Sequence, residues 1–223
     1  GLMIDRFGEK PVLFLGFLLD FAARRPRWQA VGEAVFSFGL LFEGIDILGR
    51  ALQPLAGQTV FLEWMTRVKE SPLLGILLGL CMTMVVQSSS ATIALLQNVA
   101  RQAGPDGIHS VLGLAGAVPV LLGDNIGTTV TALLACIGQG KDAVRAALAH
   151  SCFNLSGSLL AAVLLPWFVR LVEFISPKGP ELEVISRQIA NAHTAFNVCC
   201  ALLWLPFLPW MVRLVCALVP EDR

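Results

Sequence analysis

The sequence predicts an all-α integral membrane protein, and three observations lead to that fold class. The 223 residues are 56% hydrophobic and only 14% charged, with a mean hydropathy of +0.72. Several stretches carry at most one charge over the roughly 20 residues that an α-helix needs to cross the hydrocarbon core. Polar groups interrupt two of these stretches. A chain of this length cannot hide so much apolar surface in one water-facing core, so part of its solvent must be lipid.

Net charge and overall composition exclude several other classes of protein. The formal net charge is zero and the pI is about 7.0, so no nucleic-acid partner is expected. The composition also disfavours a disordered chain, a coiled coil and a disulfide scaffold. Residues 1–223 are therefore expected to form a single membrane domain in a lipid bilayer.

The first part of that domain, residues 1–33, is expected to be an amphipathic or linker helix and a basic loop. Residues 11–23 are apolar but shorter than a simple span, so they would lie in the interface, re-enter, or end a longer span. Arg24, Arg25 and Arg27 follow, and the positive-inside tendency predicts that their loop is cytoplasmic.

The second part, residues 34–137, is expected to hold one span and two interrupted stretches, and the third part, 138–223, two long spans. The first span covers residues 34–55 and carries Glu43 and Asp46. The remaining apolar stretches cover residues 71–100, 108–137, 146–169 and 188–212.

Two of these stretches contain polar residues that favour a break in the helix. The first break consists of Gln87, Ser88, Ser89 and Ser90, and the second is the GDNIGTT sequence of residues 123–129. Ser, Asn and Asp compete with backbone hydrogen bonds, and Gly weakens a helix by up to about 1 kcal/mol. We therefore expect a re-entrant helical hairpin at QSSS and a broken helix at GDNIGTT. Because lipid does not tolerate irregular backbone, both should face protein or a water-filled cavity, as broken helices do in transporters.

The pattern A-H-x-x-F-N occurs twice, and each copy is expected to open a long span. It places His150 four residues before Asn154 and His193 four residues before Asn197, so each pair shares one helix face. Two interpretations stay open for these four residues. They either support a functional site or form polar clusters at helix entries near the headgroups.

The polar groups in the two interruptions suit a small ion. The hydroxyls and amide of QSSS both donate and accept, so they could bind an anion or a hard cation such as sodium, or else join helices and bond to their own backbone. Asp124 is a costly carboxylate deep in its stretch. It could coordinate sodium, carry a proton or form a salt bridge, and Asn125, Thr128 and Thr129 add neutral oxygens beside it.

An enzyme is disfavoured. Ser88–Ser90, a histidine and Asp124 could supply an intramembrane serine hydrolase, but no G-x-S-x-G elbow is present. A nucleotide-driven pump is disfavoured too, because the sequence has no G-x-x-x-x-G-K-[ST] loop.

Four motifs together resemble the type II sodium–phosphate cotransporter family, over most of the chain from about Gly39 onward. They are VVQSSSATIALL, LLGDNIGTTVTALLA, AHSCFN and AHTAFN. The resemblance implies an inverted-repeat fold and sodium-coupled symport of inorganic phosphate by alternating access. It also implies a multi-pass protein of the cell membrane (inner or plasma) with sodium as the coupled ion. An ion-binding channel or a regulatory membrane subunit is the alternative function.

The resemblance also implies which residues form the site. Phosphate would be bound by Gln87, Ser88, Ser89, Ser90 and Asn125. Sodium would be bound by Gln87, Ser88, Asn125, Thr128 and Thr129, to which the residue-level argument adds Asp124. His150, Asn154, His193 and Asn197 would support the site.

Two departures from the family pattern matter. Asp124 stands where the family has alanine, so it could strengthen cation binding, introduce proton coupling or repel phosphate. The chain also has only one QSSS, whereas the family's transport site needs two halves. We therefore expect a second repeat, either as a missing N-terminal half or as a homodimer mate. The truncated chain is the favoured explanation, which makes this chain the second repeat.

Overall fold

The predicted all-α fold class is confirmed. The computed structural model describes residues 9–23, 25–56 and 58–220, and every named element in these residues is a helix. The chain forms two compact units, Gly1–Pro54 and Leu55–Arg223. The expected division at residues 33/34 falls inside a continuous helix, whereas the one at 137/138 falls in the turn before Lys141.

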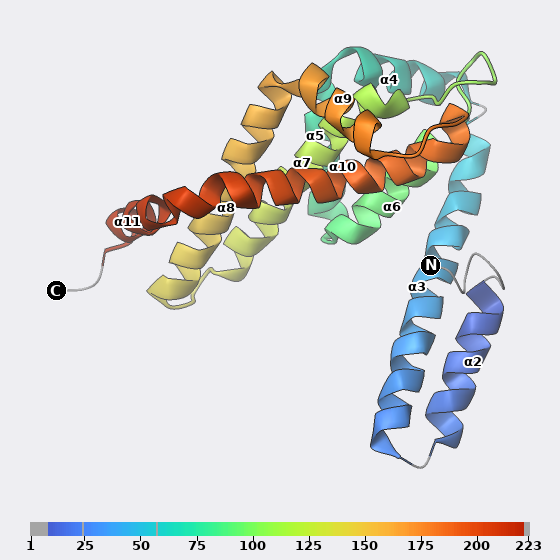
Figure 1. Ribbon diagram of the computed structural model, residues 1–223, viewed down its shortest axis with the longest axis horizontal. Coiled ribbons are helices and arrows are strands. Elements are labelled where there is room, and N and C mark those ends of the chain that lie inside the picture. Colours follow the sequence, from blue (N-terminus) through green and yellow to red (C-terminus); the bar gives the residue numbers. More distant parts are fainter. Residues whose placement is uncertain (1–8, 24, 57, 221–223) are drawn as a thin grey trace. The chain divides into compact units, whose positions relative to one another are not determined.

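The first unit is a helical hairpin. It consists of α2 (Glu9–Ala22) and most of α3 (Pro26–Ala56), which run side by side in Figure 1. Glycines allow the two backbones to touch. A Cβ atom at Gly16 would lie 2.3 Å from the Phe36 nitrogen, and one at Gly32 would lie 2.2 Å from the Asp20 nitrogen. The apolar stretch 11–23 is thus a short helix that packs against the start of α3.

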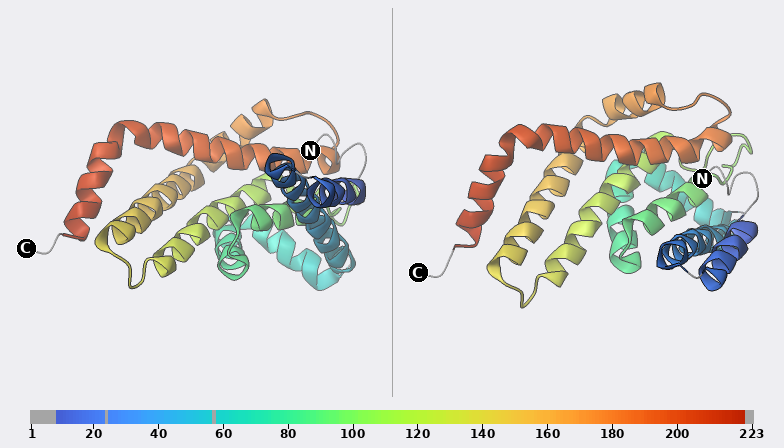
Figure 2. Two further views of the ribbon diagram at one scale, coloured as in Figure 1. Left: turned by 90° about the horizontal axis from the view of Figure 1, so that it is seen from below. Right: turned by 60° about the horizontal axis from the view of Figure 1, so that its bottom comes forward.

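The second unit contains eight α-helices and one 3-10 turn among the described residues. Figure 2 shows these helices from two further directions. They are α4 (Thr59–Glu70), α5 (Pro72–Val86), α6 (Ser89–Ala100), α7 (Gly113–Ala135), α8 (Lys141–Val163), α9 (Leu165–Ile175), α10 (Glu181–Trp204), η1 (Leu205–Phe207) and α11 (Leu208–Leu218).

Several of these helices are long and apolar enough to cross a membrane. The described residues contain three such helical segments. They are Gly113–Ala135, Lys141–Val163 and Glu181–Leu218, and the last comprises α10, η1 and α11. A fourth span results if α4 and α5, which bend by 117° at their junction, form one broken crossing. Helix α3, which covers the expected span 34–55, is not among them within the described residues. The chain is therefore a multi-pass membrane protein.

Helix α7 is the centre of the second unit. Of its 23 residues, 14 are buried, and α4, α5, α6, α8, α9 and α10 all pack against it. Its contact with α5 is the closest, because glycines on both helices remove the side chains that would keep the backbones apart. A Cβ atom at Gly79 would lie 1.8 Å from the Val120 carbonyl oxygen, and one at Gly123 would lie 1.9 Å from the Ile76 carbonyl oxygen. Small residues serve this purpose widely in membrane helices.

A short loop between α6 and α7 fixes the start of α7. The Ser110 hydroxyl donates to the Ala100 carbonyl at 2.6 Å and accepts from the Gly113 N–H at 3.0 Å. At the exposed end of the loop, Asp106 accepts hydrogen bonds from the backbone N–H groups of His109 and Ile108. These bonds favour the carboxylate and hold the pKa of Asp106 well below its usual value.

We expect Gly79→Ala to destabilise the second unit, because the added methyl group would meet a backbone oxygen rather than a movable side chain. The free energy of unfolding should fall by about 1–3 kcal/mol, as overpacking commonly costs. Denaturant titration in detergent micelles measures this change. Gly140→Ala is the matched control, since a Cβ atom there would meet nothing within 4 Å. Equal stability of the two variants would contradict the close contact.

Candidate functional site

The helix is interrupted at Gln87–Ser88, as the sequence predicts. Gln87 has a left-handed backbone (φ 56°, ψ 23°) that ends α5, and its N–H donates to the Thr83 carbonyl at 2.7 Å. Ser88 is extended and caps α6, where its hydroxyl accepts from the Ala91 N–H at 3.4 Å. The course of this hairpin through the bilayer stays a prediction.

The start of α6 carries the chemistry expected of an anion site. Gln87, Ser88 and Ser90 are exposed and Ser89 is half-buried. The N–H groups of the first helical turn have no acceptor within the helix, and the helix dipole adds partial positive charge at this end. Exposed hydroxyls and backbone N–H groups therefore meet at the break, which is the usual way in which a helix start binds an anion.

The predicted break at GDNIGTT is wrong, because α7 is one continuous helix from Gly113 to Ala135. Its polar side chains bond to their own helix. The Asn125 amide donates to the Leu121 carbonyl at 2.9 Å, and the Thr128 and Thr129 hydroxyls donate to carbonyls three residues earlier at 2.7 Å. The glycines of the motif permit the contact with α5 rather than a turn. The hydroxyl oxygens keep lone pairs that can still bind a cation.

Asp124 lies at the meeting point of three helices. Its side chain is 0% exposed, and its Oδ1 accepts a 2.6 Å hydrogen bond from the Thr83 hydroxyl on α5. The Thr83 oxygen is also 3.0 Å from the Gly79 carbonyl oxygen and 3.4 Å from the Thr92 hydroxyl on α6. Both threonines are buried. Asp124, Thr83 and Thr92 are called the acidic cluster below.

The acidic cluster lies one helical turn from the break. The Thr83 carbonyl accepts the N–H of Gln87, and the Thr92 N–H donates to the Ser88 carbonyl at 2.9 Å. The two threonines therefore flank the interruption on either side, and their hydroxyls join its two arms. The structure thus brings Asp124 to the base of the QSSS break, although it lies 34 positions after Ser90 in sequence.

One of the two carboxylate oxygens of Asp124 has no partner. Oδ2 is buried and accepts no hydrogen bond in the described part of the chain. No lysine, arginine or histidine among the described residues lies within salt-bridge distance of it. The salt bridge that the sequence left open is therefore not formed there. A cation or a proton would satisfy this oxygen.

Thr83 and Thr92 belong to the candidate site by their contacts with Asp124 and with each other, although they are not predicted from the sequence. Each stands in an apolar run, GILLGLCMTMVV and ATIALL, where a single threonine is easily read as helix packing. A usable signal was spacing. Thr83 lies four residues before Gln87 and Thr92 four residues after Ser88, so both share a helix face with the break.

The two A-H-x-x-F-N copies lie inside helices, not at their starts. The first falls within α8, which begins at Lys141, and the second within α10, which begins at Glu181. The expectation that they open the spans is therefore wrong. In each copy the asparagine amide donates to the histidine carbonyl, from Asn154 to His150 at 3.1 Å and from Asn197 to His193 at 2.9 Å. No hydrogen bond joins these four residues to the acidic cluster in the described part of the chain.

Comparison with known proteins assigns the chain to a family. The profile described as Na+/Pi-cotransporter matches residues 43–178. "Uncharacterized protein YqeW" of Bacillus subtilis (strain 168) is 30% identical over 170 residues, which cover 76% of this chain and 52% of the relative. "Sodium-dependent phosphate transport protein 2B" of Homo sapiens is 43% identical over 149 residues, which cover 62% of this chain and 20% of the relative. The chain thus spans about half of the first relative and a fifth of the second. No solved structure matches.

We expect Thr83→Val to lower the free energy of unfolding by about 1–3 kcal/mol, because it leaves the buried Oδ1 of Asp124 without its donor. Denaturant titration in detergent micelles gives the value. Thr131→Val on α7 is the matched control, since that hydroxyl bonds its own helix at the Thr128 carbonyl. It should change stability by less than about 0.5 kcal/mol. A loss of equal size in both variants would argue against the acidic cluster.

Proposed function

This chain belongs to the Na+/Pi-cotransporter family, and from that membership we propose that it carries out sodium-coupled transport of inorganic phosphate. The proposal includes alternating access as its mechanism and the cell membrane as its location. Because the chain spans about half of its Bacillus relative, a second repeat, on the same polypeptide or on a second copy, would complete the transport site.

The observation that carries this proposal is the position of a buried carboxylate beneath an exposed helix start. At the break, Ser88–Ser90 and Gln87 present donors that suit the oxygens of phosphate, and Asn125 is the candidate donor from α7. Beneath it, Asp124 and the Thr83 hydroxyl offer oxygens that suit sodium.

Sodium would bind between the phosphate at the break and the buried carboxylate of Asp124. Its proposed ligands come from the break at Gln87–Ser88, from the continuous helix α7 and from the ends of α5 and α6 that flank the break. They are Gln87, Ser88, Asp124, Asn125, Thr128 and Thr129, with Thr83 and Thr92 added from the acidic cluster. A cation there lies between the carboxylate and the phosphate and offsets both negative charges. Each ion then raises the affinity for the other, which is the thermodynamic basis of coupled transport.

Asp124 need not repel phosphate in this arrangement. One helical turn, about 5.4 Å along the axis, separates the acidic cluster from the break, so a phosphate bound at the break would not contact the carboxylate directly. With sodium absent, the uncompensated carboxylate would disfavour phosphate. The order of binding would then be sodium first.

We expect Ser89→Ala and Asn125→Ala to reduce sodium-driven uptake of labelled phosphate by about tenfold or more, the effect of losing a hydrogen bond to a charged ligand. Uptake into proteoliposomes with an inward sodium gradient measures this. Thr194→Ala is the control, because it removes an exposed hydroxyl bonded to its own helix. Unchanged uptake in both variants of an active preparation would remove these residues from the site.

We expect Asp124→Asn to raise the sodium concentration for half-maximal uptake by about tenfold and to change the phosphate dependence much less. The amide keeps the shape of the side chain but lacks the charge that attracts a cation. Asp142→Asn is the matched control, since this acid is exposed and paired with Arg145 at the start of α8. A fall in stability with unchanged sodium dependence would give Asp124 a structural role only.

A further inference from the structure

The C-terminal part of the chain repeats itself at an interval of 43 residues. Residues 149–172 and 192–215 are identical at 13 of 24 aligned positions. The identities gather at the two ends of the repeat. A-H-x-x-F-N begins each copy, and each copy finishes with L-P-W-x-V-R-L-V, at residues 165–172 and 208–215. The second motif plays no part in the ion site proposed above.

The structure repeats at the same interval. Helices α9 (Leu165–Ile175) and α11 (Leu208–Leu218) both have 11 residues, begin at equivalent positions and carry proline in the first turn. In both helices, equivalent positions are buried and equivalent positions are exposed. Val172 and its equivalent Val215 are buried, whereas Trp167 is 69% and Trp210 is 74% exposed. The tryptophan and arginine of each copy are therefore retained on the outside, where packing does not require them.

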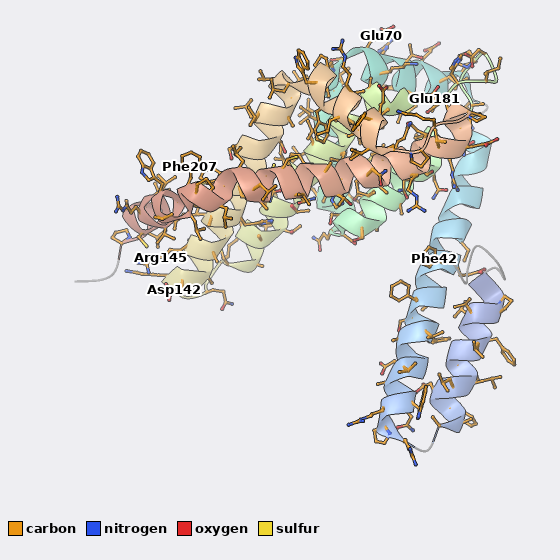
Figure 3. All side chains as sticks on the ribbon, viewed as in Figure 1. Phe42, Glu70, Asp142, Arg145, Glu181 and Phe207 are labelled. Carbon is orange, nitrogen blue, oxygen red and sulfur yellow. The ribbon has the colours of Figure 1, made fainter. Side chains whose placement is uncertain are left out.

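These two helices lie at opposite ends of α8. Helix α9 follows the last turn of α8 directly, at Leu164. The end of α11 is bound to the first turn of α8, because Lys141 donates to the Pro220 carbonyl at 2.8 Å and Arg145 donates to the Val219 carbonyl at 3.0 Å. Figure 3 labels Asp142 and Arg145 at this end of α8. The 23 residues of α8 rise about 34 Å, slightly more than the thickness of the hydrocarbon core. If α8 crosses the bilayer, one copy lies at each face.

The exposed residues of both copies suit the boundary between lipid and water. Tryptophan prefers the headgroup level, and the planar guanidinium of arginine binds phosphate oxygens in pairs. The Arg170 guanidinium lies 5.4 Å from the centre of the Trp167 ring, so the two groups face outward together. Neither Arg170 nor Arg213 forms a salt bridge within the described residues. Apolar neighbours such as Phe174, which is exposed, would enter the acyl region.

We propose that α9 and α11 are duplicated interfacial anchors that bind anionic phospholipid headgroups, one at each face of the membrane, through Arg170 and Arg213. Trp167 and Trp210 set the depth of each helix. Proline in the first turn of each short helix separates it from the span before it, so that the helix can lie along the membrane surface. The pair holds the two ends of α8 at the two interfaces while other parts of the protein move.

The headgroup part of the proposal is tested by lipid retention on the full chain purified in detergent. The lipid is palmitoyl-oleoyl phosphatidylglycerol, titrated and counted by native mass spectrometry. Arg170→Gln and Arg213→Gln should each lower its affinity about fivefold, the share of one basic residue near an anionic surface. Arg187→Gln, an exposed arginine of α10 outside the repeated motif, is the matched control and should leave the affinity within about twofold. Equal losses in all three variants would overturn the proposal.

A second arm separates lipid from free phosphate. An excess of inorganic phosphate should leave the retained phosphatidylglycerol unchanged, because the anchors bind a headgroup together with its acyl chains. Displacement of the lipid by phosphate would assign Arg170 and Arg213 to the free anion and overturn the assignment to lipid. This result does not depend on whether the chain transports phosphate.

The placement at two faces is tested by labelling from one side. Gly140→Cys lies beside the end of α11, and Lys178→Cys lies just after α9. In intact cells an impermeant maleimide, located by peptide mapping, should label one of these cysteines and reach the other only after permeabilisation. Labelling of both in intact cells, or of neither until permeabilisation, would put the two anchors on one face and overturn the proposal.

Discussion

The direct contact between the backbones of α5 and α7 is the constraint on which the second unit depends. With no side chain at Gly79 or Gly123, carbonyl oxygens of each helix occupy the space that a Cβ atom would need. This approach lets the short side chain of Thr83 reach Asp124, which is 41 residues away in sequence. A wider spacing would leave the carboxylate in an apolar interior with no donor, at a cost of several kcal/mol. The close packing at Gly79 and Gly123 therefore permits the hydrogen bond between Thr83 and Asp124 on which the candidate site depends.

The same contact explains why α7 stays helical through a sequence that favours interruption. A broken helix would release carbonyl groups that need new partners, and the tight interface with α5 leaves no room for them. Asn125, Thr128 and Thr129 instead direct their donors to their own helix, so the backbone remains satisfied while their oxygens stay available. Polar groups can thus enter a membrane interior without breaking the element that carries them.

The sequence predicts local features of the fold well and contacts between distant segments poorly. Four polar residues after a long apolar run predict the break at Gln87–Ser88. The same residues form one of the motifs that indicate the family. Whether Gly123 makes a turn or a helix contact depends on α5, which lies more than 35 residues earlier, and periodicity does not show this. The apolar stretch begins only at residue 146, after the charged residues Lys141, Asp142 and Arg145, whereas helix α8 already begins at Lys141.

The hydrogen bonds from Lys141 and Arg145 to the carbonyls of Pro220 and Val219 have a consequence for biosynthesis. They join residues 79 and 74 positions apart, so the first turn of α8 can receive these contacts only after α9, α10 and α11 have left the ribosome. The carbonyls of Pro220 and Val219 become available to Lys141 and Arg145 only after α9, α10 and α11 have been synthesised. The two contacts that join α11 to the start of α8 therefore form after the helices between them, and a chain that stops before Val219 would lack both contacts.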